Sequence, residues 1–212
     1  MCELRDEFEN ESTPVVISGC LGPRGDGYEP GVTMTPDEAQ KYHATQIETF
    51  SETAADQVTA MTLTYSEEAV GIARAAQVAG LPAVISFTVE TDGRLPTGQD
   101  LRDAINFVDD ATSGAPPYYM INCAHPTHFA SALEPGRDWT NRIRGVRLNA
   151  SCLSHAELNE SVELDDGDVN ELAVQVGGIC KTFPQINVVG GCCGTDHRHI
   201  REIAINARGA RN

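Results

Sequence analysis

Three cysteines occupy positions from which the folded chain could bring their thiolates together. Cys192 and Cys193 are adjacent in a Gly-Gly-Cys-Cys-Gly-Thr segment, residues 190–195, and Cys123 follows the apolar run 118–122. Neighbouring side chains of an extended strand point to opposite faces, so both can reach one metal ion only where the backbone turns sharply. The flanking glycines permit such a turn. We therefore predict that the three cysteines share one site.

The chemistry of such a site follows from its donor set. Three thiolates about 2.3 Å from a zinc ion leave the fourth tetrahedral position open, which is typical of a catalytic zinc site. A substrate thiol bound there would lose its proton and remain a nucleophile at neutral pH, which is the activation that a sulfur methylation requires. The alternatives are that these cysteines are inert buried thiols or a redox pair.

The cysteine count favours thiolate chemistry over a disulfide framework. The chain has seven cysteines, an odd number, in a protein too large to need disulfides for stability. The N-terminus has no basic segment followed by an apolar run, and no stretch approaches the ~20 apolar residues that span a bilayer. We predict a cytoplasmic protein.

Length and charge limit the classes of partner. With 212 residues and 41% hydrophobic content, residues 1–212 are expected to form one domain. A formal net charge of -16 opposes binding to nucleic acid and to anionic membranes. Small molecules or proteins are the expected partners.

Short apolar runs alternate with stretches of helical periodicity, which is typical of repeated βα units around a parallel sheet. The predicted strands are 14–19, 57–63, 83–88, 118–122, 145–148 and 186–189. The predicted helices are 36–53, 66–80, 101–110, 126–133, 170–180 and one after Asp196, with an acidic loop at 164–168. In a (β/α) barrel the carboxyl ends of the strands carry the active site, and Cys123 and the 190–195 segment both follow strands.

The 190–195 segment resembles the signature of the homocysteine S-methyltransferase family. Four further segments resemble that family's barrel strands with their following loops, and the resemblance covers nearly the whole chain. These segments are 14–19 with Gly22-Pro23, 86–89 with 92–95, 121–123 and 148–151.

The resemblance implies a fold, a reaction and a set of site residues. The fold would be an α/β TIM-barrel type, incomplete, with about six of the eight βα units and without the first two. The chain would be a homocysteine-binding domain, short at its N-terminus, that moves a methyl group onto the thiol of homocysteine to give methionine, with Zn²⁺ as cofactor and a small-molecule methyl donor. No catalytic residue is expected beyond the zinc site. The implied residues are Cys123, Cys192 and Cys193 as zinc ligands, and Asn122, Asn149, Gly191 and Thr88 in the substrate pocket.

One departure from the family leaves alternatives open. Met61 stands where the family has a glutamate that helps to hold the amino group of homocysteine, and a methionine cannot accept that hydrogen bond. Glu67, Glu68 or another acid would replace it, or the substrate is a different thiol. The other possibilities are a zinc-binding inactive or regulatory homologue, or a subunit that completes its barrel by association, including homo-oligomerisation. The sequence does not identify the methyl donor.

Four histidines lie near the cysteines. His125 and His128 could join Cys123 in a Cys-x-His-x-x-His metal site, but the three-cysteine site accounts better for Cys192 and Cys193. His197 and His199 precede or begin a helix, where a histidine usually forms a hydrogen bond or faces solvent. None of the four is expected to be catalytic.

Overall fold

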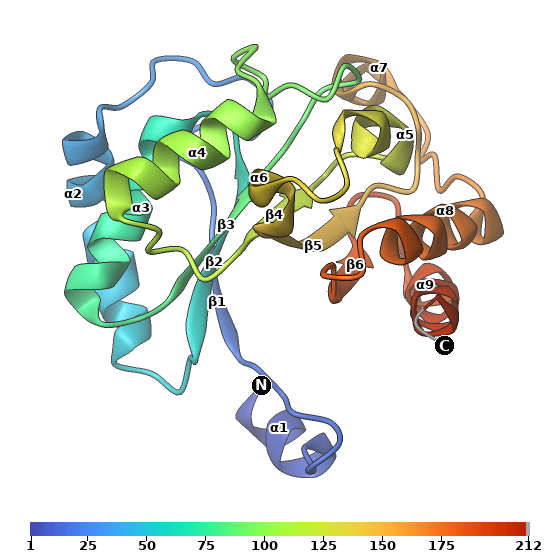
Figure 1. The fold of residues 1–212 in the computed structure, drawn as a ribbon, viewed down its shortest axis with the longest axis horizontal. Helices are drawn as coiled ribbons and strands as arrows, with labels where there is room; N and C mark the ends of the chain where they lie inside the picture. The colour runs from blue at the N-terminus through green and yellow to red at the C-terminus, as the bar shows by residue number, and fades with distance from the viewer. Residues whose placement is uncertain (211–212) are drawn as a thin grey trace.

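The computed structural model describes residues 1–210 as one curved, six-stranded parallel sheet with helices beside it (Figure 1). The strand order β1-β2-β3-β4-β5-β6 follows the chain, and every neighbouring pair is parallel. The strands are β1 (Ser18–Leu21), β2 (Gln57–Leu63), β3 (Ala83–Phe87), β4 (Tyr119–Asn122), β5 (Ile143–Leu148) and β6 (Val188–Gly191).

At least one helix follows each strand, so the described residues contain six βα units. The segments are α1 (Cys2–Phe8), α2 (Pro36–Ser51), α3 (Ser66–Ala79), α4 (Leu101–Thr112), α5 (Pro126–Phe129), the 3-10 helix η1 (Ala130–Ala132), α6 (Asp138–Asn141), α7 (His155–Glu160), α8 (Val169–Thr182) and α9 (His197–Gly209). The prediction of an α/β fold of TIM-barrel type with about six of eight units is confirmed. None of the helices within residues 1–210 has the length and apolar character needed to cross a membrane.

Local sequence explains where the helices begin and end. Thr35 and Glu38 form a reciprocal capping box before α2, with Pro36 at the first helical position. Gly80 ends α3 with φ of 68°, a left-handed conformation that glycine adopts without steric cost. The buried strands β3 and β4 supply the centre of the hydrophobic core.

Two strands differ from their predicted bounds by shifts toward the carboxyl end. β1 begins at Ser18 because the main-chain ladder with β2 starts there, whereas the N–H of Ile17 donates instead to the carboxylate of Asp56. β6 runs from Val188 to Gly191 because it pairs with β5 as far as Leu148. The strand therefore includes the Gly-Gly pair and ends immediately before Cys192.

Three helices were not predicted, and one predicted helix is divided in two. α1, α6 and α7 are short, with seven, four and six residues. The helix predicted for 126–133 is divided into α5 and η1. α7 has consequences for the site, because it places His155 beside the end of β4.

Candidate metal and substrate site

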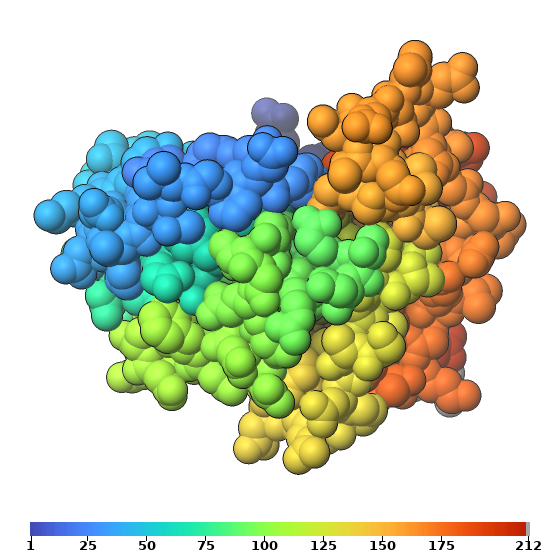
Figure 2. Space-filling model, turned by 90° about the horizontal axis from the view of Figure 1, so that it is seen from above, coloured from blue at the N-terminus to red at the C-terminus, as the bar shows by residue number. Residues whose placement is uncertain are grey.

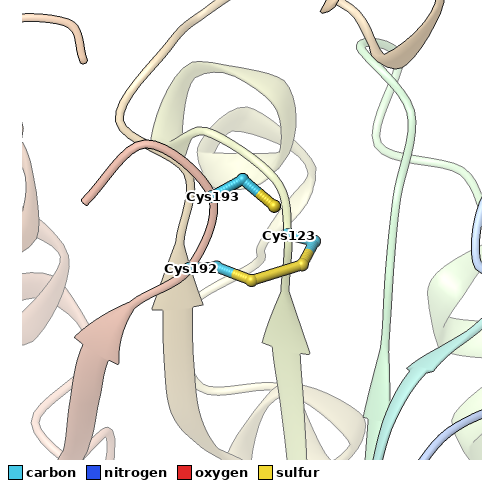
Figure 3. Close-up of side chains that lie close together, drawn as sticks. All are labelled: Cys123, Cys192 and Cys193. Carbon is cyan, nitrogen blue, oxygen red and sulfur yellow. A yellow bond between two sulfur atoms is a disulfide. The ribbon is translucent and has the colours of Figure 1, made fainter. Parts of the chain in front are cut away.

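The three cysteines meet at the carboxyl ends of β4 and β6 (Figure 3). Their sulfur atoms all lie within 4.8 Å of one another. Cys123 is buried, Cys192 is partly exposed and Cys193 is exposed. Cys123 and Cys192 are joined as a disulfide with Cα atoms 5.6 Å apart, and Cys193 is a free cysteine (Figure 3).

The donor set suits zinc when all three cysteines are reduced. Thiolates bound to one zinc ion lie about 3.8 Å apart, given bonds of about 2.3 Å in a tetrahedron. The separations in this cluster are compatible with that spacing once the Cys123–Cys192 bond is reduced. Among residues 1–210, these cysteines form the single group of three or more potential ligands that converge in this way.

The backbone of the Cys-Cys segment is held by several contacts. The N–H of Cys192 donates to the carbonyl of Leu148 at 2.7 Å, and Thr195 Oγ1 donates to the carbonyl of Cys192 at 2.7 Å. Gly194 has φ of 77°, and a Cβ added there would lie 2.8 Å from the carbonyl oxygen of Asp165. The sharp turn predicted from the glycines is therefore present.

Asn149 connects the two cysteine segments. Its Nδ2 donates to the carbonyl of Cys123 at 3.1 Å, and its Oδ1 accepts from the N–H of Cys193 at 3.2 Å. The side chain is 3% exposed and lines the cavity described below. Its role as a substrate ligand stays a prediction, since these two contacts already engage both ends of its amide.

Asn122 is engaged within the protein. Its Oδ1 accepts from the N–H of Thr62 at 2.8 Å and from Ser86 Oγ at 2.6 Å, and its Nδ2 donates to Thr62 Oγ1 at 2.7 Å. Thr62 has φ of 60°, which is unusual for a branched residue, and these contacts stabilise it. Asn122 therefore supports the irregular carboxyl-terminal part of β2.

The other two predicted pocket residues differ in their surroundings. Gly191 is the last residue of β6, and a Cβ there would lie only 2.1 Å from Thr195 Oγ1. Thr88 is fully buried, and its Oγ1 has no hydrogen-bond partner within residues 1–210. Neither they nor Asn122 lines the cavity beside Cys193, as far as the described residues show.

A cavity of about 950 Å³ opens beside Cys193. Tyr28, His155, Asn149 and Cys193 line it, and its acidic lining residues are Asp26, Glu29, Glu90, Glu160, Glu163 and Asp165. No lysine or arginine lines the cavity in the described part of the chain. Figure 2 looks down on the molecule from above, and the orange segment around residue 160 rises there beside the blue segment near residue 30. Because its lining is acidic, the cavity favours a cation over an anion.

Three residues of this region were not predicted: Tyr28, Glu90 and His155. The Tyr28 ring packs on the His155 ring with centroids 4.0 Å apart, and its hydroxyl lies 3.9 Å from Cys193 Sγ. Burial and the nearby Cys193 raise the pKa of Tyr28 well above its usual value. All three residues lie between a strand end and the next long helix, and that position was the available signal.

Glu68 does not replace the glutamate that is absent at Met61. Its side chain is fully buried, and Oε1 accepts from the N–H of Arg24 at 2.7 Å and contacts His43 Nε2 at 2.9 Å. Because this side chain has no exposed surface, its carboxylate is closed to a substrate. Met61 itself is partly exposed in β2.

The neighbouring histidines contact the protein and stay outside the cysteine cluster. His125 caps α5 through Thr127, and burial followed by the charge of His128 lowers the pKa of His125 to about 4. His128 Nε2 lies 2.9 Å from the carbonyl oxygen of Cys152. His199 is buried in the capping box of α9, whereas His197 is exposed.

Comparisons with known proteins agree with this geometry. A family model described as homocysteine S-methyltransferase matches residues 1–207. Homocysteine S-methyltransferase YbgG of Bacillus subtilis is 26% identical over 222 residues, which cover 97% of this chain and 68% of YbgG.

Solved structures of the homocysteine methyltransferase MmuM from Escherichia coli share the fold. The metallated form has a TM-score of 0.71 at 19% identity and covers 98% of this chain and 66% of that one. The oxidized form has a TM-score of 0.69 at 21% identity, with coverage of 100% and 66%. The chain thus spans about two thirds of the length of these relatives.

Proposed function

We propose that this chain, which belongs to the homocysteine S-methyltransferase family, transfers a methyl group to the sulfur of homocysteine and yields methionine at a zinc site. The observation that carries the proposal is the convergence of three cysteine sulfurs within 4.8 Å at the strand ends. Cys123, Cys192 and Cys193 would hold the zinc. When bound, zinc supplies the positive charge that favours the deprotonated form of a substrate thiol at neutral pH.

The protein's own residues would orient the reactants. Asn149 fixes Cys123 and Cys193 relative to each other, and Cys193 faces the acidic cavity. A thiolate sulfur at this edge would attack the methyl carbon of a donor in the cavity. The new bond is sulfur to carbon, and the electron pair of the broken bond stays on the donor's leaving atom.

The cavity supports a cationic donor. Six carboxylic acids and no lysine or arginine line it among the described residues, and the Tyr28 and His155 rings form part of its wall. A sulfonium or quaternary ammonium group is attracted both by the carboxylates and by an aromatic face. Free thiolates also suit a reducing compartment, so we propose a cytoplasmic location.

The first experiment measures zinc per chain after purification under reducing conditions. We expect about one zinc in the wild type and a strong loss in Cys193→Ala, because two thiolates hold zinc much less tightly than three. Cys20→Ala is the matched control, since Cys20 is an exposed free cysteine outside the cluster, and it should keep its zinc. A reduced wild type that stays metal-free in added zinc would contradict the proposal.

The second experiment offers the zinc-loaded protein several thiols and donors. Methionine should form from homocysteine with a sulfonium or quaternary ammonium donor, and more slowly with an anionic folate donor. The position of Met61 and the burial of Glu68 favour one competing possibility, a different thiol substrate. Tighter binding of another thiol in calorimetric titration, with no methionine formed from homocysteine, would favour that possibility instead.

A further inference from the structure

The backbone of Cys123 adopts a conformation that needs support. Its φ is 52°, in the left-handed region that residues with a Cβ seldom adopt. Its N–H donates to the carbonyl of Arg147 at 3.0 Å, which continues the ladder with β5. The chain therefore changes direction at the residue whose sulfur must meet those of the two cysteines that follow β6.

Two side chains donate to the carbonyl of Cys123. One is Asn149, described above, and the other is His155, whose Nε2 lies 2.7 Å from that oxygen. A carbonyl oxygen has two lone pairs, so these two contacts use its full capacity. The peptide after Cys123 is thereby fixed by the residue that follows β5 and by the first residue of α7.

Glu90 and Tyr28 in turn hold His155. Glu90 Oε1 lies 3.0 Å from His155 Nδ1, so the ring is fixed at both nitrogens. The Tyr28 ring covers one side, and the His155 side chain is only 9% exposed. Tyr28 also reaches Cys193 Sγ at 3.9 Å, so the same group of residues contacts two of the three cysteines.

We propose that His155, aligned by Glu90 and covered by Tyr28, is a positioning residue of the thiolate site. It holds Cys123 in the left-handed conformation from which its sulfur converges with those of Cys192 and Cys193. This inference rests on the proposed function, because it assumes that the three thiolates bind one metal ion. His155 acts through the carbonyl of Cys123 and need not touch the metal or the substrate.

Cobalt(II) binding to the reduced full chain tests the proposal. Cobalt in a tetrahedral thiolate site gives sulfur-to-metal charge-transfer bands and intense d–d bands, which report ligand number and geometry. Against the wild type, His155→Ala should weaken cobalt binding roughly 10- to 100-fold, the usual effect of removing a group that orients a ligand, and should reduce the charge-transfer bands. His155→Gln retains an N–H donor and should restore affinity to within about threefold of the wild type. His197→Ala removes an exposed histidine at the start of α9 and should match the wild type.

The outcomes separate this inference from the function on which it rests. A His155→Ala variant with the wild-type spectrum and affinity overturns the inference while leaving the zinc site intact. Equal losses in His155→Ala and His155→Gln, with a lower melting temperature of both metal-free proteins, also overturn it, since they indicate a general structural role. A wild type that binds no cobalt contradicts the proposed function and removes the inference with it.

Discussion

The two adjacent glycines before Cys192 have different surroundings. A Cβ on Gly191 would lie 2.1 Å from Thr195 Oγ1 and 2.7 Å from Thr195 Cβ, whereas a Cβ on Gly190 would meet only Arg147 Cγ at 3.9 Å. Thr195 Oγ1 donates to the carbonyl of Cys192, so the crowded position lies beside the bond that holds the cysteine turn. Of these two positions, only that of Gly191 therefore requires a glycine.

This difference predicts opposite results for two similar substitutions. Gly191→Ala should force Thr195 away from Cys192, lower the free energy of unfolding by about 1–3 kcal/mol and weaken zinc binding. Gly190→Ala should change the unfolding free energy by no more than about 0.5 kcal/mol. Urea unfolding and zinc titration of the two variants measure these effects. Equal behaviour of the pair would show that Gly191 has no special packing role.

The sequence predicted which residues lie at the strand ends better than it predicted what they contact. The convergence of the three cysteines follows from their positions after β4 and β6, and the structure brings them together. Asn122 was placed correctly at the end of β4, but its amide is used by Thr62 and Ser86. Those partners come from β2 and β3, and no local pattern indicates which neighbour will offer a donor.

At the scale of elements, a buried pair joins α2, α3 and the loop after β1. His43 of α2 and Glu68 of α3 are 2% and 0% exposed, and Glu68 also accepts from the N–H of Arg24. Tyr65 adds a second connection, since its hydroxyl accepts from the N–H of Met34 at 3.0 Å. The loop that carries Tyr28 to the site is therefore attached to the helices at two points.

Removal of the Glu68 carboxylate should be costly. Glu68→Ala leaves the N–H of Arg24 and one nitrogen of His43 without an acceptor in the interior, and we expect a loss of about 3 kcal/mol in unfolding free energy. Glu67→Ala changes the neighbouring, partly exposed carboxylate and should cost about 0.5 kcal/mol or less. Chemical denaturation of both variants provides the comparison. A small effect at Glu68 would mean that the loop is held chiefly by other contacts.

A second link between elements makes stability depend on pH. The Tyr119 hydroxyl of β4 donates to Asp109 of α4 at 2.8 Å, and Arg142 pairs with the same carboxylate at 2.8 Å. Burial, followed by the bond to Asp109, raises the pKa of Tyr119 well above 10. Above pH 10 the unfolded chain loses this phenolic proton while the folded chain retains it.

The contribution of Tyr119 to the free energy of unfolding should consequently be fully present below pH 10. It should fall as the pH rises above 10. One retained proton contributes a slope of about 1.4 kcal/mol per pH unit, and Tyr119→Phe should remove that contribution. The pH dependence that remains in Tyr119→Phe includes contributions from Tyr28 and Tyr65, whose pKa values are also raised. Unfolding free energies measured across the alkaline range test this, and an unchanged slope in Tyr119→Phe would contradict it.

Element bounds show where local patterns stop being informative. α2, α3 and α4 were predicted closely because each contains a periodic apolar stretch with a local boundary signal: Thr35 and Asp100 cap the starts of α2 and α4, and Gly80 ends α3. α7 was missed because it is only six residues long and buries none of them. Its importance lies in the contact of His155 with Cys123, a pair 32 residues apart that sequence spacing does not reveal.

For the whole molecule, the distribution of charge matters as much as its sum. The chain has 31 acidic residues against 15 lysines and arginines, and the cavity beside Cys193 is lined by acids without a lysine or arginine among the described residues. The sheet also has two unpaired edge strands in the described region, β1 and β6. A homo-oligomer that covers these edges stays a prediction, and its formation would have to overcome repulsion between like-charged copies.

Salt should therefore act on stability and on donor binding with opposite signs. The Debye length falls from about 30 Å at 0.01 M to about 3 Å at 1 M ionic strength, so added sodium chloride screens the repulsion within a chain of net charge -16. We expect the melting temperature to rise over this range. The same screening weakens the attraction between the acidic cavity and a cationic methyl donor, so the KM for that donor should rise as well. An uncharged thiol ligand is the control, since its affinity should change little. If the KM for the cationic donor is constant across this range, the carboxylates of the cavity do not bind it. If the melting temperature is constant, the excess charge does not destabilise the fold.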